Sequence, residues 1–213
     1  MKKRNINLTL AITFNSPFIV GSGFGAAGLI DLKSVKDKDD IVYFPATSLK
    51  GKVKAEFKKI MLTIDSGNIC NTTINKKICK FDNIKEACVI CRIFGSEFYE
   101  GSLIFEDAVM DYETHDILSK IETDKIMPQS QLSIRTGIRI KIILKTAEDK
   151  GFFNFETVNP SIVFTSRIHG DVWLTDEEYI FFKKNIESIT HLGGNKARGL
   201  GRCSIEINEE VST

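Results

Sequence analysis

The sequence predicts a single α+β domain in which two helices cover one face of an antiparallel sheet. Apolar and polar residues alternate strictly near both ends of the chain, and a period of two is typical of half-buried strands. Two other stretches repeat apolar residues every three or four positions, as amphipathic helices do. The 213 residues, 42% hydrophobic and 27% charged, suffice for one large globular domain.

The first half of the chain predicts a strand, a helix and a second strand. Strict alternation runs from Ile6 to Phe14. The stretch FPATSLKGKVKAEFKKIM then predicts a helix with Thr47 or Ser48 as its N-cap and lysines on its outer side. A short apolar run, SLIFEDAVM, predicts the next strand. The apolar face of the helix is expected to comprise Leu49, Val53, Phe57 and Ile60.

The second half predicts a hairpin, a strand, a helix and a last strand. The stretch LSIRTGIRIKIILKTAEDKGFFNFETV suggests a hairpin that turns at Asp149 to Gly151, and 162–173 is the next strand candidate. Thr175 and Glu178 form a capping box at the start of the helix. GRCSIEIN alternates again and predicts the final strand. The apolar face of the second helix is expected to comprise Tyr179, Phe182, Ile186 and Ile189.

Apart from the hairpin, these elements follow the order strand, helix, strand, strand, helix, strand. That order is the split β-α-β arrangement of a ferredoxin-like fold. We expect one domain over 1–213 with two insertions, one at about 63–92 that holds four cysteines and one at about 110–160.

The overall charge gives little indication of a partner. Lys and Arg number 29 and Asp and Glu 28, so the net charge of +1 does not predict a uniformly basic, nucleic-acid-coating surface. No apolar run approaches the roughly 18 residues that would span a bilayer, and the first residues, MKKRNINLTL, lack the apolar core of a signal peptide. We therefore expect a cytoplasmic protein without a membrane partner.

Four cysteines predict a structural Zn²⁺ site. Cys70, Cys79, Cys88 and Cys91 have the spacing C-x8-C-x8-C-x2-C, and the last pair forms the two-residue knuckle typical of zinc sites. Two disulfides or unrelated buried thiols are the alternatives, and a cytosolic location disfavours disulfides. Four thiolates leave no open position for water, so a catalytic zinc is not expected.

Gly23, Gly25 and Gly28 form a G-x-G-x-x-G, the spacing of a dinucleotide-binding fingerprint. A dinucleotide site also needs a long helix directly after the glycines. The following residues, LIDLKSVKDKDD, have no apolar period of 3.6, which argues against that site. Glycines can instead let the backbone bend sharply or approach a ligand closely.

A second glycine cluster, HLGGNKARGLGR at 191–202, interleaves glycines with basic residues between the last helix and strand. Exposed amides and basic side chains suit a polyanion backbone such as RNA phosphate. An ordinary helix-to-strand turn and a solvated charged face are the alternatives. The candidate RNA contacts are Ser48, Lys50, Lys52, Lys54, Gly193, Gly194, Lys196, Arg198 and Arg202.

Three stretches in order resemble one known family. FPATSLKGKVKAEF resembles its P-x-S-S-L-K-G helix start, RIFGSEFYEGSLIFEDA its FG-…-G-x-L-x-F-x-D-A segment, and HLGGNKARGLGRCSIEI its C-terminal glycine-rich loop. The family is that of the repeat-associated RNA-binding (RAMP) proteins of CRISPR effector complexes. The chain looks most like the Cas7 backbone group of type III systems (Csm3-like and Cmr4-like subunits), and its cysteine cluster resembles that of zinc-bearing members.

The resemblance implies a modified RNA-recognition fold and an antiviral defence function. Copies of the chain would stack along a guide crRNA with other type III subunits, and a β-hairpin thumb near residues 134–157 would intrude between the guide and the complementary target RNA. Ile138, Ile140 and Phe152 would supply its apolar wedge. Asp31 matches the aspartate that catalytic members need for cutting target RNA, with Mg²⁺ or another divalent ion as cofactor.

Other interpretations remain for these residues. Asp31 can be the first residue of a solvated acidic loop, and the three apolar thumb residues can be core strand residues. The chain departs from zinc-bearing members at Lys141, Ile142 and Ile143, where they often carry an acidic-basic pair.

The alternative functions are a non-cleaving scaffold subunit, a guide-processing ribonuclease and a zinc-stabilised protein unrelated to RNA. Such a ribonuclease would commonly use histidine as its acid or base. The available histidines are His115, His169 and His191.

Overall fold

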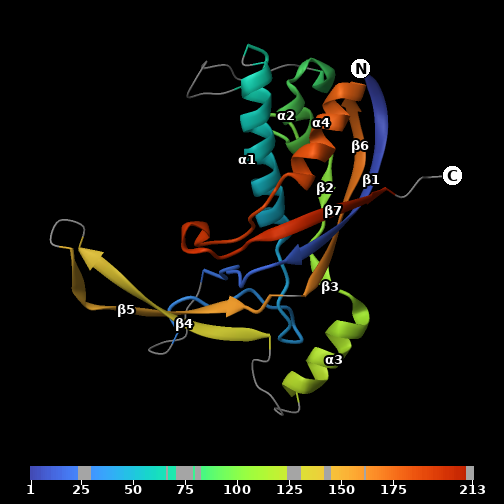
Figure 1. The fold of residues 1–213 in the computed structure, drawn as a ribbon. Coiled ribbons are helices and arrows are strands. Elements are labelled where there is room, and N and C mark those ends of the chain that lie inside the picture. Colours follow the sequence, from blue (N-terminus) through green and yellow to red (C-terminus); the bar gives the residue numbers. More distant parts are fainter. Residues whose placement is uncertain are drawn as a thin grey trace.

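In a computed structural model of the chain, a five-stranded antiparallel sheet forms the centre of the molecule (Figure 1). The structure describes residues 1–23, 30–65, 67–70, 79, 83–123, 131–141, 145–160 and 162–209. The strands of the sheet are β1 (Lys2–Phe14), β2 (Ile104–Phe105), β3 (Val109–Met110), β6 (Val163–Leu174) and β7 (Cys203–Glu209).

The order of the strands confirms the ferredoxin-like prediction. The sheet runs β2-β6-β1-β7, with β3 also pairing β6, and every pair is antiparallel. Strands β2 and β3 together take the place of the second strand of the split β-α-β arrangement. Two long helices, α1 (Ala46–Ile64) and α4 (Asp176–Glu187), lie side by side over one face of this sheet (Figure 1).

The core lies between that face and the two helices. The even-numbered residues from Ile6 to Phe14 in β1 are buried, as the alternation predicts. The rings of Phe14 and Phe18 stack with centroids 3.7 Å apart at the end of the strand. The described helices contribute Leu49, Val53, Phe57 and Met61 from α1, and Phe182 and Ile186 from α4.

Two residues predicted for the apolar faces are less buried than expected. In α1 the burial repeats every four residues, so Met61 enters the core and Ile60 stays partly exposed. Tyr179 is half-buried, because its ring lies under the Arg4 guanidinium at 4.9 Å. Ile189 is buried just beyond the end of α4.

The N-cap predicted for α1 is wrong. The helix begins at Ala46 after Pro45, which makes no side-chain cap. Instead the Ala46 N–H donates to Asp107 Oδ1 at 2.7 Å, and Phe44 and Ala108 exchange two backbone hydrogen bonds of 2.8 Å. The Asp107 carboxylate thus takes the place of the predicted hydroxyl cap. The stretches FPATSLKGKVKAEF and RIFGSEFYEGSLIFEDA therefore meet at the start of α1.

The capping box predicted for α4 is confirmed. The Glu178 N–H donates to Thr175 Oγ1 at 3.1 Å, and the Thr175 N–H donates to Glu178 Oε2 at 2.8 Å. Glu178 also forms a 2.5 Å salt bridge with the buried Arg92 of α2 (Val89–Phe94). The cap therefore ties α4 to the short helix that follows the cysteine segment.

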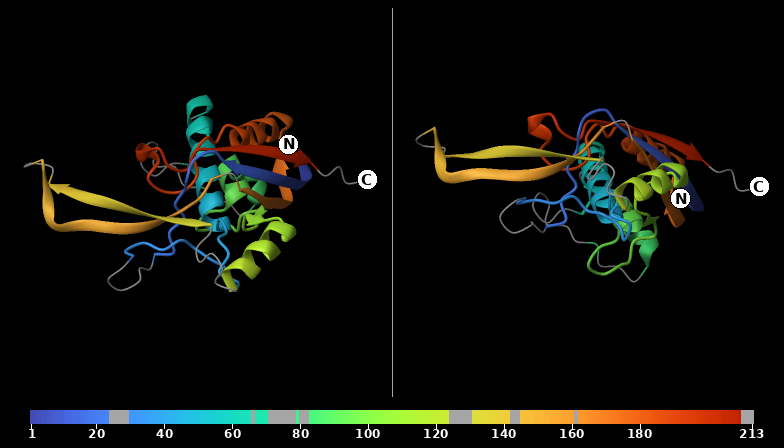
Figure 2. Two further views of the ribbon diagram at one scale, coloured as in Figure 1. Left: turned by 60° about the horizontal axis from the view of Figure 1, so that its bottom comes forward. Right: turned by 90° about the horizontal axis from the view of Figure 1, so that it is seen from below.

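Strands β4 (Leu132–Lys141) and β5 (Thr146–Val158) pair with each other as a second, two-stranded sheet. This hairpin, called the arm below, projects well away from the body of the molecule (Figure 2). The helix α3 (Tyr112–Thr123) precedes it in the chain. The single-turn helices Ile84–Glu86 and Lys196–Arg198 complete the described elements.

The turn predicted at Asp149 to Gly151 is wrong, because these residues lie inside β5. The pairing jumps from Ile138↔Phe152 to Ile140↔Ala147, so β5 carries extra residues at this point. Lys150 has a φ of 58°. The turn-forming residues therefore mark a bulge in the arm and not its tip.

The helices among the described residues are too short or too polar to cross a membrane.

Candidate functional site

The segment that contains Asp31 lies along the inner end of the arm. The Asp31 and Leu32 N–H groups both donate to the Asn154 carbonyl oxygen, at 2.8 and 3.3 Å. The Glu156 N–H donates to the Leu32 carbonyl oxygen at 3.0 Å, and Leu32 forms a parallel bridge with Phe155. The segment is thus bound to β5 as a short third strand.

Asp31 presents an exposed carboxylate in a fixed position. Its Oδ2 accepts a 2.8 Å hydrogen bond from the Asn154 N–H. The Asn154 Oδ1 in turn accepts from Thr136 Oγ1 at 2.8 Å across the arm. The structure therefore brings the predicted catalytic aspartate and the predicted thumb together, although more than one hundred residues separate them in sequence.

The neighbouring aspartates have other contacts. Asp37 accepts hydrogen bonds from the Asp39 and Ile41 N–H groups at 2.8 and 2.9 Å, and contacts His115 Nε2 at 2.8 Å. Burial acts to raise the pKa of Asp37, but these hydrogen bonds and the His115 contact outweigh it and lower that pKa. Asp37 therefore serves to shape the loop, whereas Asp40 is exposed.

The described residues that flank the glycine fingerprint lack the helix that a dinucleotide site needs. Gly21 forms an antiparallel bridge with Ser34, and described residues 30–45 contain no helix. A Cβ on Gly21 would lie 2.8 Å from Leu32 Cδ1, so this glycine leaves room for the segment bearing Asp31. Gly25 and Gly28 lie outside the described residues.

The C-terminal glycine loop packs against the same region. Gly193 has a φ of +87°, and a Cβ there would lie 2.4 Å from the Ile19 carbonyl oxygen, which also accepts the Gly194 N–H at 3.0 Å. A small apolar cluster of Ile19, Phe155 and Leu200, with Leu32 and Phe153 packed against it, joins this loop to the arm and to the Asp31 segment.

Between the glycine loop and α1 lies a cavity of about 280 Å³. Lys52 and Lys196 line it, and the charge of Lys52 lowers the pKa of Lys196. Lys52 also forms a 2.5 Å salt bridge with Glu56, and an anion bound in the cavity would relieve the remaining repulsion between the two lysines. The predicted contacts that line this cavity are Ser48, Lys52, Gly193, Gly194 and Lys196.

Four other predicted contacts do not line this cavity. Lys50 lies over the Phe105 ring at 5.9 Å, and Lys54 donates to the Gly95 carbonyl oxygen at 3.1 Å. Helix positions two apart point in different directions, so alternate lysines of α1 cannot share one face. Arg198 and Arg202 are exposed on the glycine loop and the start of β7.

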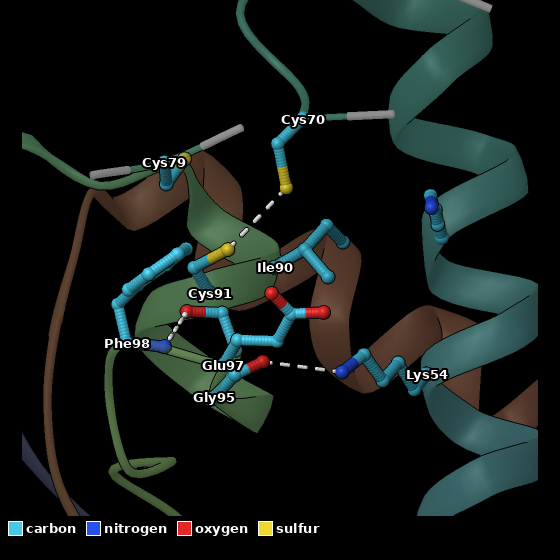
Figure 3. Close-up of a pocket in the computed structure, with 10 residues that line it drawn as sticks. Lys54, Cys70, Cys79, Ile90, Cys91, Gly95, Glu97 and Phe98 are labelled. Carbon is cyan, nitrogen blue, oxygen red and sulfur yellow. Dashed lines mark hydrogen bonds between the residues drawn. The ribbon is translucent and has the colours of Figure 1, made fainter. Parts of the chain in front are cut away.

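The four predicted zinc ligands lie together beside α1 and α2. All four sulfur atoms are within 4.8 Å of one another, and the cysteines are free thiols. The Cys70 Sγ lies 3.3 Å from the Cys91 Sγ and 3.6 Å from the Cys88 Sγ. Figure 3 shows Cys70 and Cys91 pointing toward each other from the end of one segment and from α2.

This donor set fits a tetrahedral zinc ion. Sulfurs bound at about 2.3 Å in a tetrahedron lie about 3.8 Å apart, close to the distances found. The Cys88 N–H donates to the Cys79 Sγ at 3.4 Å, a contact that supports a thiolate. A hydrogen bond from Cys91 lowers the pKa of Cys88 to about 4, while the same contact and burial raise the pKa of Cys91.

The three thumb residues predicted as wedge atoms are exposed. The exposed fractions are 44% for Ile138, 62% for Ile140 and 70% for Phe152, so the alternative that they are core residues is wrong. A Cβ on Gly137 would lie 2.3 Å from the Phe153 ring, so glycine at this position leaves room for that ring.

The three histidines lie in different places. His115 contacts Asp37, His169 Nε2 lies 3.2 Å from Glu106 Oε1 on the sheet, and His191 lines the cavity beside the glycine loop. In the part of the chain that the structure describes, the hydrogen bonds of Asp31 run to the arm and to none of these side chains.

Sequence reasoning missed Asp107 and Glu156. The helix cap supplied by Asp107 depends on a contact between segments sixty residues apart. Glu156 is buried although it is an acidic residue. In the sequence it is marked only as a glutamate between Phe155 and Thr157, which are both buried in the structure.

Comparison with known proteins places the chain in one group. A model of the RAMP superfamily matches residues 11–204. A search of curated proteins found no match.

Two solved structures of the Type III-B Cmr-beta complex contain similar chains. For the apo state, the TM-score is 0.61 at 15% identity, covering 97% of this chain and 99% of that chain. For the state bound to cognate target RNA, the TM-score is 0.61 at 15% identity, covering 94% and 96%. At this identity the likeness shows a shared fold.

Proposed function

The chain belongs to the RAMP superfamily, and on that premise we propose that it is a Cas7-like backbone subunit of a type III CRISPR effector complex, which binds guide RNA and cuts complementary target RNA. One observation carries the proposal. The exposed carboxylate of Asp31 is fixed at the inner end of an arm that bears exposed apolar side chains.

Guide RNA binding is assigned to the cavity between α1 and the glycine loop. Lys52 and Lys196 provide positive charge there, and the Ser48 hydroxyl provides a hydrogen-bond donor. These groups suit phosphates and not base edges, so binding would be independent of sequence. The target would then be selected by base pairing with the guide.

The arm is assigned the displacement of base pairs. Ile138 and Phe152 are paired across its two strands and both are exposed, so the hairpin presents an apolar wedge. Such side chains unstack bases when they are inserted between them. A target nucleotide freed in this way would lie near the inner end of the arm, where Asp31 is held.

The proposed reaction uses the 2′-hydroxyl of the displaced nucleotide. Its oxygen attacks the adjacent phosphorus while the 5′-oxygen leaves, giving a 2′,3′-cyclic phosphate and a new 5′-hydroxyl end. Asp31 accepts the proton of the attacking hydroxyl or orients it. Mg²⁺ or another divalent ion bound there would supply stabilisation of the phosphate charge, and a single carboxylate with phosphate oxygens is a usual Mg²⁺ environment.

A structural Zn²⁺ is assigned to the cysteine cluster. Cys79, Cys88 and Cys91 are buried and Cys70 is partly buried, so these four thiolates would hold the metal largely within the protein. Its role would be to fix the segment between α1 and α2, where few apolar residues are available.

The test is cleavage of labelled complementary RNA by the assembled complex with its guide and magnesium. We expect Asp31→Ala to lower the cleavage rate by about 10²-fold or more, the scale of a lost general base, while target binding stays unchanged. The matched control is Asp40→Asn, an exposed aspartate of the same loop whose φ of 63° asparagine tolerates.

Each alternative has its own outcome. Guide-dependent binding without any cuts by the wild-type complex would leave a scaffold subunit. Cleavage of the guide precursor, lost in His191→Ala, would indicate a guide-processing ribonuclease. A chain with no RNA affinity, alone or with its partner subunits, would refute the RNA assignment.

A further inference from the structure

A buried carboxylate holds the segment that bears Asp31 against the arm. Glu156 lies in β5 with 3% of its surface exposed, and its Oε2 accepts the Ser34 N–H at 2.7 Å. Its own N–H donates to the Leu32 carbonyl oxygen at 3.0 Å. One residue of the arm thus binds the segment at two points, one through the main chain and one through a buried charge.

The Ser34 N–H faces the arm because the rest of the segment is held from the opposite side. The Ser22 N–H donates to the Lys33 carbonyl oxygen, and the Val35 N–H donates to the Val20 carbonyl oxygen, both at 2.9 Å. The segment therefore runs between residues 20–22 and β5. The position of the segment therefore depends on residues 20–22 and on β5.

Burying a carboxylate is an expensive way to stabilise a fold. Burying an acidic side chain costs free energy that its contacts recover only in part. An acceptor for one loop amide does not require a charge. The burial of Glu156 therefore points to a role in geometry.

We propose that Glu156 positions Asp31, by fixing residues 31–35 to β5 so that the Asp31 carboxylate and the arm move as one unit. The proposal rests on the function proposed above, because it names a positioning residue for that cleavage. An RNA duplex that displaces the arm would carry Asp31 with it, and the carboxylate would stay aligned with the nucleotide that the arm has displaced.

Two variants separate positioning from stability. Glu156→Gln keeps a carbonyl acceptor for the Ser34 N–H, whereas Glu156→Met has a similar length and no acceptor. Glu148→Gln is the matched control, since this glutamate is exposed on the outer part of the same strand. Asp31→Ala is measured in parallel, and all variants are assembled with guide RNA and partner subunits.

Three quantities are measured: single-turnover cleavage, target affinity and hydrogen exchange of the 31–35 amides. For Glu156→Met we expect cleavage to fall by about tenfold or more, because a small misplacement of a catalytic group costs that much, with affinity within about twofold of wild type. The amides of residues 31–35 exchange faster, and the thermal midpoint falls by no more than the loss of one buried hydrogen bond would cause. Glu156→Gln restores most of the cleavage, and Glu148→Gln matches wild type.

The outcomes distinguish this inference from the function on which it rests. If Asp31→Ala cuts normally, the proposed catalytic role of Asp31 fails. The hydrogen exchange of the 31–35 amides still tests whether Glu156 fixes this segment to β5. If Asp31→Ala is inactive and Glu156→Met cuts like wild type, Glu156 does not position Asp31.

A purely structural role predicts a loss of cleavage that follows the fall in thermal midpoint across the variants, weaker target binding and no rescue by Glu156→Gln. Should Glu156→Met fail to fold, the hydrogen-exchange rate of the Ser34 amide in the wild-type protein provides the test. A Ser34 amide that exchanges at the rate of an open loop would contradict the proposal that Glu156 fixes residues 31–35 to β5. A Ser34 amide that is protected like the β5 amides supports it.

Discussion

At the scale of single residues, close approach of main-chain atoms determines where glycine is required. Gly201 has a φ of +76°, and a Cβ there would lie 2.0 Å from the Leu192 carbonyl oxygen. Gly199 has a similar φ of +78°, but a Cβ would meet no atom within 4 Å. The two glycines therefore pay the same backbone cost on substitution and differ only in the clash.

This difference gives a paired prediction. Gly199→Ala should lower the free energy of unfolding by about 1–2 kcal/mol, the cost of a left-handed backbone for an L-residue. Gly201→Ala should cost more, because the backbone at Leu192 must also shift. Urea denaturation of both variants measures the difference, and equal losses would contradict the close approach.

At the scale of elements, sequence patterns correctly predicted the features that depend on residues close together in the chain. The alternation of β1 and the capping box of α4 each depend on residues a few positions apart, and both predictions are confirmed. The start of α1 and the Asp149–Gly151 turn were mispredicted. A carboxylate sixty residues away caps the start of α1, and the pairing register of the arm makes Asp149–Gly151 part of a bulge.

The cysteine segment is the element whose stability should depend on metal. Three of its ligands are buried, and burial raises the pKa of Cys79. We expect about one zinc per chain and a clear fall in the thermal midpoint with a strong chelator, because structural zinc contributes directly to folding. Cys91→Ser should lose the zinc, whereas Cys203→Ser, in β7 and outside the cluster, should keep it. Full stability of metal-free protein would contradict the site.

At the scale of the whole molecule, the site is assembled from distant parts of the chain. The sequence alone places Asp31 in a charged loop, the glycines near the C-terminus and the arm in the middle. The cluster of Ile19, Phe155 and Leu200 brings these three parts together. No local pattern encodes that contact, so the candidate residues were predictable one by one and their arrangement was not.

The near-neutral charge of the molecule sets how it should respond to salt. With 29 basic and 28 acidic residues, long-range attraction to RNA is weak, and binding must depend on local cations such as Lys52 and Lys196. Lys196→Ala should weaken guide binding and reduce the slope of log affinity against log salt by about 0.7–1. Lys38→Ala, an exposed lysine of the loop before α1, should leave the slope unchanged. Equal slopes for wild type and Lys196→Ala would exclude a phosphate contact at Lys196.

The hydrogen bonds between Asp31 and the arm have a consequence for how the site can evolve. The partners at positions 32 and 154 act through N–H and carbonyl groups, which every residue type except proline provides. The side chain at position 154 can therefore change without loss of the hydrogen bonds that hold the carboxylate, whereas Leu32 also packs against the cluster of Ile19, Phe155 and Leu200. Divergence to the 15% identity found among similar folds does not by itself erase such a site.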